Sequence, residues 1–269
     1  MKLTLNGHTA FASTGGRDFD PTGDVVMFLH GSGQNHLGYM LQHRYLANRG
    51  FQCLTPDLPG HGPSEGAPLD SIEAQAAWFA DFAKAAGVQK AHIVGHSQGG
   101  LMALELARSH ASLLRSITFI ATAQAIPVND MLLDMARDDQ PKAIAAMMDW
   151  GHGPTAHRHD HTMPGTSHKL YGTQLMASNA PGALFADLTA CARYTGGPEA
   201  AETITCPTLT ILAGQDKMTP IKQGRKLAAA LPLNTAHEVP QGGHMLITEQ
   251  PFAVNAALKP FLAAQSASV

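Results

Sequence analysis

Cysteine, net charge and long apolar runs are all scarce in this sequence. Its 269 residues include three cysteines, Cys53, Cys191 and Cys206, which lie far apart and form no C-x-x-C pair. This spacing predicts neither a disulfide framework nor a zinc site, so we expect free, buried thiols. The formal net charge of −3 leaves no large basic field of the kind that binds nucleic acid.

Segments that would enter a membrane or direct secretion are also missing. No stretch reaches the roughly 18 consecutive apolar residues of a membrane-spanning helix. Residues 1–13 alternate between polar and apolar side chains, which is not typical of a secretory signal. Hydrophobic residues nevertheless make up 44% of the chain, enough for a sizeable core. We therefore expect a soluble, cytoplasmic, globular protein.

Short apolar segments alternate with helical segments over most of the chain. Strands are expected at residues 2–5, 9–13, 25–29, 51–55, 91–95, 116–121, 208–213 and 235–239. Helices are expected at residues 39–48, 71–86, 99–110, 220–231 and 251–264. Strands that alternate with helices are typical of parallel sheets. The predicted fold class is α/β, with a mostly parallel central sheet flanked by helices.

The alternation stops for about seventy residues and then returns. The intervening stretch has helical patches but no clear strand; the patches are at residues 128–137, 141–150, 168–179 and 181–194. An open α/β sheet of this length is commonly one unit. We therefore predict a single core, residues 1–124 and 204–269, with a helical cap, residues 125–203, inserted into it.

A nucleophile motif follows the strand expected at residues 91–95. Residues Gly95-His96-Ser97-Gln98-Gly99 match G-x-S-x-G, and a helical segment follows. This strand–turn–helix setting is the one that the motif requires. The sharp turn lifts the serine above the sheet and leaves no room for side chains two positions before and after it. The alternative is a glycine-rich turn that contains an ordinary serine.

The motif resembles the nucleophile elbow of the α/β-hydrolase family, and the resemblance covers essentially the whole chain. The H-G-S-G sequence of residues 30–33 follows an apolar strand and is similar to the family's HGxG loop. This resemblance implies that the backbone N–H groups of Ser32 and Gln98 form an oxyanion hole. A strand-end turn with a structural His30 is the alternative. Residues 57–64, D-L-P-G-H-G-P-S, resemble another loop of the family, which supports the fold more than the chemistry.

A serine hydroxyl needs a base to take its proton, and the base needs an acid to orient it. In the α/β-hydrolase family the histidine lies in the loop after the last strand. Two histidines follow the predicted cap. His237 lies inside an expected strand, whereas His244 lies in a loop before the last helix, so we predict that His244 is the base.

The acid is predicted to be Asp216, which directly follows the strand expected at residues 208–213. By resemblance to the family, this turn carries the acid of the triad. The other usual position, residues 121–124, contains no carboxylate. The alternative role for Asp216 is to cap the helix that follows.

These residues together predict a carboxylesterase-type serine hydrolase that acts on a small carboxylic ester through an acyl-enzyme on Ser97. No cofactor is required. Four other reactions remain open within the fold: hydrolysis of a carbon–carbon bond, a lactone or an amide, and perhydrolysis. A non-catalytic small-molecule receptor is the alternative outside catalysis. Neither the natural substrate nor the oligomeric state follows from the sequence.

Methionine is enriched in the predicted cap, and five histidines are close together in one segment of it. The six methionines are at positions 131, 135, 147, 148, 163 and 176, and they suit either a lipophilic pocket or the cores of small helices. Met218 and Met245, beside Asp216 and His244, are expected to line the site. The histidines are at positions 152, 157, 159, 161 and 168. They offer zinc ligands but lack cysteine and regular spacing, so we predict a polar loop and no metal.

Overall fold

The computed structural model describes residues 1–157, 165 and 167–266. Within them, eight strands form one sheet in the order β1-β2-β4-β3-β5-β6-β7-β8. The strands are β1 (Lys2–Leu5), β2 (His8–Ser13), β3 (Val25–Leu29), β4 (Gln52–Pro56), β5 (Ala91–His96), β6 (Leu114–Ile120), β7 (Thr208–Ala213) and β8 (Asn234–Val239). Only β2 pairs antiparallel with its neighbours, β1 and β4; the other pairs are parallel. The predicted α/β class with a mostly parallel sheet is confirmed.

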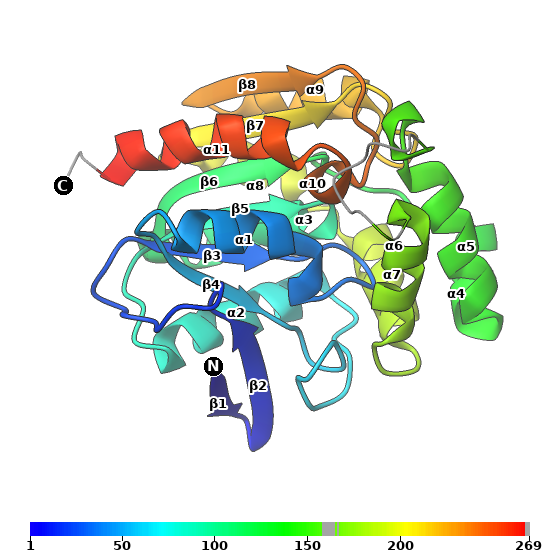
Figure 1. The fold of residues 1–269 in the computed structure, drawn as a ribbon, viewed down its shortest axis with the longest axis horizontal. Helices are drawn as coiled ribbons and strands as arrows, with labels where there is room; N and C mark the ends of the chain where they lie inside the picture. The colour runs from blue at the N-terminus through cyan, green and yellow to red at the C-terminus, as the bar shows by residue number, and fades with distance from the viewer. Residues whose placement is uncertain (158–164, 166, 267–269) are drawn as a thin grey trace.

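Helices cover both faces of the sheet (Figure 1). One face carries α1 (Met40–Ala47) and α11 (Pro251–Ser266), and the other carries α2 (Ile72–Ala85), α3 (Gln98–Ser109) and α9 (Ile221–Ala230). Strand β3 contributes to both layers because successive side chains of a strand point to opposite faces. Val25, Met27 and Leu29 join the α2/α3 core, whereas Val26 and Phe28 join the α1/α11 core. A strand buried on both faces has no polar position, which is why its sequence is a continuous apolar run.

The described residues between β6 and β7 form helices, which we call the helical insertion. They are α4 (Asp130–Asp138), α5 (Gln140–Gly151), the 3-10 helix η3 (Pro154–His157), α6 (His168–Ala177), α7 (Ala183–Arg193) and α8 (Gly197–Thr203). Helices α4 to α7 lie together at one end of the sheet (Figure 1). Helix α8 was not expected from the sequence; it has seven residues and packs between α3 and α9. The limits 125 and 203 of the predicted cap remain predictions.

The order of the strands creates a crevice at the carboxyl ends of β3 and β5. From β3 the chain moves to β4 on one side of β3, and it then returns to form β5 on the other side. Loops leaving β3 and β5 therefore diverge, and open α/β sheets bind ligands at such a point. Residues 30–33 follow β3 and Ser97 follows β5, so both motifs lie at this crevice.

The cysteines and the helix lengths agree with most of what the composition predicts. Cys53, Cys191 and Cys206 are free, as expected, and Cys53 and Cys191 are buried; Cys206 is only partly buried, so the expectation of a buried thiol was wrong there. Burial raises the pKa of both buried thiols to about 12, so they stay protonated at neutral pH. No helix in the described ranges is long and apolar enough to cross a membrane.

Candidate active site

Ser97 occupies a strained turn between β5 and α3. Its backbone has φ 54° and ψ −120°, a region that residues with a side chain rarely adopt. The two glycines of the motif permit the close approach of the neighbouring chain. A Cβ atom on Gly95 would lie 2.2 Å from the carbonyl oxygen of Gly99, and one on Gly99 would lie 2.0 Å from that of Leu29. The local sequence is therefore what this turn demands.

The structure brings Ser97, His244 and Asp216 together, although 147 residues separate Ser97 from His244. His244 lies in the loop between β8 and α10 (Leu246–Glu249), and Asp216 follows β7. His244 Nε2 is 2.9 Å from Ser97 Oγ, and His244 Nδ1 is 2.8 Å from Asp216 Oδ2. All three residues are buried, whereas His237, the other histidine considered, is exposed on β8. This is the geometry in which a histidine can accept the proton of a serine.

Asp216 is held as a carboxylate by the turn that contains it. Its Oδ1 accepts the N–H groups of Met218 and Thr219, both at 2.8 Å, and its Oδ2 lies 2.7 Å from the Thr219 hydroxyl. Burial opposes ionisation, but the charge of His244 and these hydrogen bonds together lower the pKa of Asp216. Thr219 was not predicted from the sequence. The sequence feature that could have pointed to Thr219 is a hydroxyl side chain three positions after the acid and just before a helix.

Ser32 and Gln98, the two predicted backbone donors, follow neighbouring strands of the sheet, β3 and β5. Ser32 is in the loop after β3, and Gln98 is the first residue of α3. In the described part of the chain, the N–H groups of both residues donate to no acceptor. The first N–H groups of a helix have no partner within the helix and favour negative charge. Both amides therefore remain candidates for the predicted oxyanion hole.

His96 supports the loop that carries His244. Its Nε2 donates a hydrogen bond to the backbone carbonyl of His244 at 2.8 Å, and the two rings lie 5.1 Å apart. Burial and the nearby His244 lower the pKa of His96 to about 3, so the ring is neutral and its one proton is on Nε2. His96 belongs to the motif, but sequence reasoning gave it no role.

A cavity of about 120 Å³ opens beside Ser97 and His244. The helical insertion supplies most of its apolar wall, from residues Ile126, Pro127, Val128, Leu132, Met147, Trp150 and Leu188. Met218 and Met245 also line it, in the position expected from their neighbours in the sequence. Among the methionines of the predicted cap, Met147 lines this cavity and Met163 lies outside the described residues.

Comparison with known proteins identifies the family. Residues 26–257 match the Alpha/beta hydrolase family. The chain belongs to this family. BpoC of Mycobacterium tuberculosis, provisionally named a non-heme bromoperoxidase, is 29% identical to this α/β hydrolase over 265 residues, which cover 93% of this chain and 98% of BpoC. The pimeloyl-[acyl-carrier protein] methyl ester esterase of Chromobacterium violaceum is 31% identical over 242 residues, which cover 85% and 91% of the two chains.

Solved structures show the same fold for this α/β hydrolase. A thermophilic esterase from Thermogutta terrifontis superposes with a TM-score of 0.84 and 22% sequence identity, covering 99% of this chain and 98% of the esterase. At this level of identity the likeness establishes the fold, and the chemistry must be argued from the site.

The histidine-rich segment of this α/β hydrolase stays untested as a metal site. Arg158 to His161, with the side chain of His157, lie outside the described residues. Two of the five histidines are described: His152 and His168 are buried, with ring centroids 6.1 Å apart. Within the described ranges, no group of three or more histidine, cysteine, aspartate or glutamate side chains is arranged to hold a metal ion.

Proposed function

We propose that this α/β hydrolase is a serine esterase that acts on a small carboxylic ester through an acyl-enzyme on Ser97. The observation that carries the proposal is the buried chain of contacts from Ser97 Oγ through His244 to Asp216, at 2.9 and 2.8 Å. A serine at this distance from a histidine can be activated as a nucleophile. The name of the Chromobacterium relative, an esterase for a methyl ester, supports the choice of an ester.

In the proposed mechanism, neutral His244 takes the proton of Ser97 as its oxygen attacks the ester carbonyl. The N–H groups of Ser32 and Gln98 stabilise the oxyanion of the tetrahedral intermediate. His244 then gives its proton to the departing alcohol. Water, deprotonated by His244, attacks the acyl-enzyme and releases the acid. Asp216 orients His244 and stabilises its protonated form without taking up the proton.

The size of the cavity supports a short acyl group. Its volume of about 120 Å³ is of the order of cavities that hold one benzene-sized molecule. The apolar wall from α4, α5 and α7 suits a hydrocarbon chain. We also propose that residues 125–203 form a cap over the site, since Leu132, Met147 and Leu188 of this segment line the cavity.

Ester hydrolysis with p-nitrophenyl acetate, butyrate and octanoate tests the proposal directly. We expect the highest kcat/KM with a short acyl chain. Ser97→Ala should lower kcat by about 10⁴-fold or more, because nucleophile and base act as one unit. Intact mass after treatment with a fluorophosphonate should show one adduct, which is absent in Ser97→Ala. If wild-type protein formed no adduct and hydrolysed none of the esters, the proposal would fail.

Perhydrolysis is a second candidate, favoured by the name of BpoC, which matches nearly the full chain. In this reaction hydrogen peroxide replaces water as the attacking group. The acyl-enzyme then yields a peracid, and Ser97 regains its proton from the peroxide through His244. Added peroxide should divert the acyl group to peracid, which can be titrated chemically. Unchanged acid formation with no peracid would leave hydrolysis as the one activity of the site.

A further inference from the structure

Asp187 is a carboxylate of the helical insertion that is buried completely, at 0% exposure, inside the core. It lies on α7 and contacts four separate parts of the chain. Its Oδ2 accepts the N–H of Gly33 at 2.7 Å and faces His61 Nε2 at 3.0 Å. Its Oδ1 accepts the side-chain amides of Gln75 and Gln98, at 3.2 and 3.1 Å. The two oxygens together have four donors, so the carboxylate is fully satisfied.

Two of these four contacts reach the proposed oxyanion hole. Gly33 directly follows Ser32, and Gln98 directly follows Ser97. Asp187 therefore binds Gly33, the residue after the predicted donor Ser32, and the side chain of Gln98, which is the other predicted donor. Gly33 has φ +66°, and a Cβ atom there would lie 2.9 Å from Leu184 of α7, so the insertion also packs closely against this residue.

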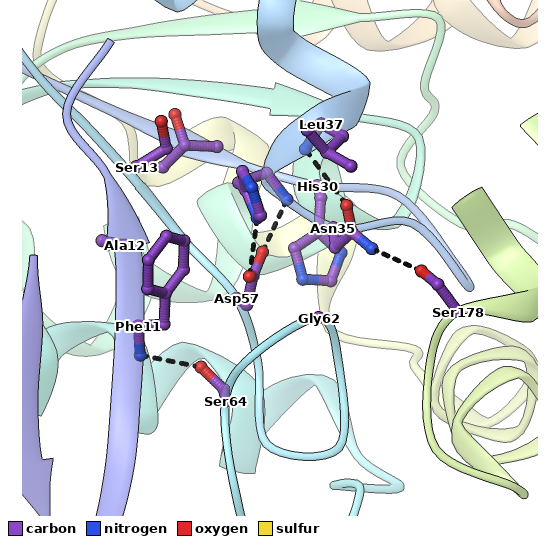
Figure 2. Close-up of polar contacts among 12 residues, drawn as sticks. Phe11, Ala12, Ser13, His30, Asn35, Leu37, Asp57, Gly62, Ser64 and Ser178 are labelled. Atoms are coloured by element: carbon purple, nitrogen blue, oxygen red, sulfur yellow. Dashed lines mark hydrogen bonds and ion pairs between the residues drawn. The ribbon is translucent and has the colours of Figure 1, made fainter. Parts of the chain in front are cut away.

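Asn179, in the turn before α7, holds the same loop from its other side. Its Nδ2 donates to the carbonyl oxygen of Gly33 at 2.6 Å, and its Oδ1 accepts from Asn35 at 3.1 Å and from the N–H of Gly62 at 2.9 Å. Figure 2 shows Asn35 reaching Ser178, the preceding residue, and Gly62 lying nearby. Both polar groups of Gly33, its N–H and its carbonyl, are thus bound by side chains of the insertion.

His61 is the cation that balances Asp187. Its Nδ1 lies 3.1 Å from the carbonyl oxygen of Pro59, and its Nε2 faces the carboxylate. Because both neighbours are acceptors, both ring nitrogens must carry protons. Burial favours the neutral ring, but the charge of Asp187, the hydrogen bonds to Asp187 and Pro59, and the charge of Asp57 together raise the pKa of His61.

The other titratable groups around His61 come from the core. Asp57, directly after β4, is paired with His36 at 2.7 Å. The ring of His30, after β3, lies 5.0 Å from that of His61. Burial, together with the charge of His61, lowers the pKa of His30 to about 4, so His30 is neutral. Figure 2 shows Asp57 and His30 near each other, and Ser64 anchored to β2 through the N–H of Phe11 at 2.9 Å.

We propose that Asp187 and Asn179 are positioning residues for the oxyanion hole, and that the buried ion pair of Asp187 with His61 makes this positioning depend on pH. The inference rests on the proposed function, because it assumes that the amides of Ser32 and Gln98 bind the oxyanion. Neither residue contacts the reacting atoms. Both act by fixing the loop after β3 and the start of α3, so the insertion must be seated on the core for the two donors to align.

The first test compares Asp187→Asn and Asn179→Ala with the wild-type enzyme in p-nitrophenyl butyrate hydrolysis. Misplaced donors should lower kcat by about 10-fold or more and leave KM within about twofold, because they act on the transition state rather than on substrate binding. The matched control is Tyr171→Phe. It removes another hydrogen bond between insertion and core, from Tyr171 to the carbonyl of Leu37 at 2.8 Å, without touching residues 30–33.

The second test uses the pH profile of kcat, which a purely structural contact would not move. In the wild type we expect kcat to fall on the alkaline side as His61 loses its proton. His61→Gln donates to Asp187 at every pH and should remove that fall.

The outcomes separate this inference from the proposed function. Absence of a Ser97 adduct and of turnover in the wild type would sink the proposed function, and with it this inference. If the wild type is active and labelled, but Asp187→Asn and Asn179→Ala both match Tyr171→Phe in kcat, the positioning role is wrong. If one of the two variants does not fold, the other decides. An alkaline fall that persists in His61→Gln would overturn the pH dependence.

Discussion

The strained turn at Ser97 packs so closely against the neighbouring backbone that one added Cβ atom would clash with it. A Cβ on Gly99 would lie 2.0 Å from the carbonyl oxygen of Leu29, and backbone cannot move aside as a flexible side chain can. We therefore predict that Gly99→Ala lowers the free energy of unfolding by about 2 kcal/mol or more, measured by urea denaturation. Gly23→Ala is the control, since the Cβ there would meet only the side chain of Gln52. Equal losses in the two variants would contradict the prediction.

Thr219 is the residue of the site whose role is easiest to isolate. Its hydroxyl lies 2.7 Å from Asp216 Oδ2, 2.9 Å from the carbonyl oxygen of Ala121 and 3.1 Å from His244 Nδ1. Thr219→Val keeps the shape but removes a hydrogen bond to a charged group, which is worth about 1.5–3 kcal/mol. We expect the pKa of Asp216 to rise toward its ordinary value and kcat to fall about 10-fold or more. Thr219→Ser retains the hydroxyl and should stay near wild type; a Val variant as active as Ser would refute the role.

At the scale of elements, the sequence predicted the strands and longer helices, because local residue patterns determine them. The strands at β3, β5 and β7 are apolar runs, and Ser97, Asp216 and His244 each follow a strand or lie in a loop at the same edge of the sheet. Helices α8 and α10 were missed because they have seven and four residues, too few for a helical period to show. The predicted roles of the site residues remain to be tested by the experiments above.

Helix α4 offers a test of which face of the insertion bounds the substrate. Leu132 lines the cavity beside Ser97, whereas the adjacent Leu133 points to a different surface groove. Leu132→Ala should enlarge the acyl site, and the kcat/KM ratio of octanoate to acetate ester should rise about 10-fold, since a single methylene group is worth about 1–3 kcal/mol. Leu133→Ala should leave the ratio unchanged. The ratio, unlike absolute activity, is insensitive to a general loss of folded enzyme, so an unchanged ratio in Leu132→Ala would contradict the assignment.

At the scale of the whole molecule, the contacts that join insertion and core were beyond the reach of sequence patterns. Asp187 is 154 residues from Gly33 and 126 residues from His61. No local motif surrounds Asp187. In the sequence, an aspartate on an amphipathic helix looks the same whether its side chain faces solvent or a buried partner. His61 belongs to the loop recognised at residues 57–64. Its positive charge, however, follows from Asp187, which only the tertiary structure brings close to it. Long-range polar pairs of this kind need the tertiary structure, because their spacing along the chain carries no period.

Four other histidines are buried in the neutral form, and together they tie the stability of the fold to pH. Burial is the largest cause in each case: it lowers the pKa of His30, His43 and His92 to about 4 and that of His96 to about 3. In the unfolded chain each would titrate near 6.5. Between these values the unfolded state binds more protons, so stability is fully present above pH 6.5 and is lost as the pH falls toward 4. His61 has the opposite sign, since its raised pKa gives stability that is lost as the pH rises through it.

The proton uptake of a buried histidine on unfolding can be measured by replacing one buried and one exposed histidine. His43 is buried against Thr55, with Nδ1 3.0 Å from its hydroxyl, whereas His237 is exposed on β8. His43→Gln should reduce the slope of unfolding free energy against pH by about 1.4 kcal/mol per pH unit, one proton, in the acid window. His237→Gln should leave the slope unchanged, because the exposed side chain of His237 is in contact with solvent in the folded as in the unfolded chain. Urea denaturation across that window gives the slope directly. A slope in His43→Gln equal to that of the wild type would mean that His43 is already protonated, or equally solvated, in the folded protein.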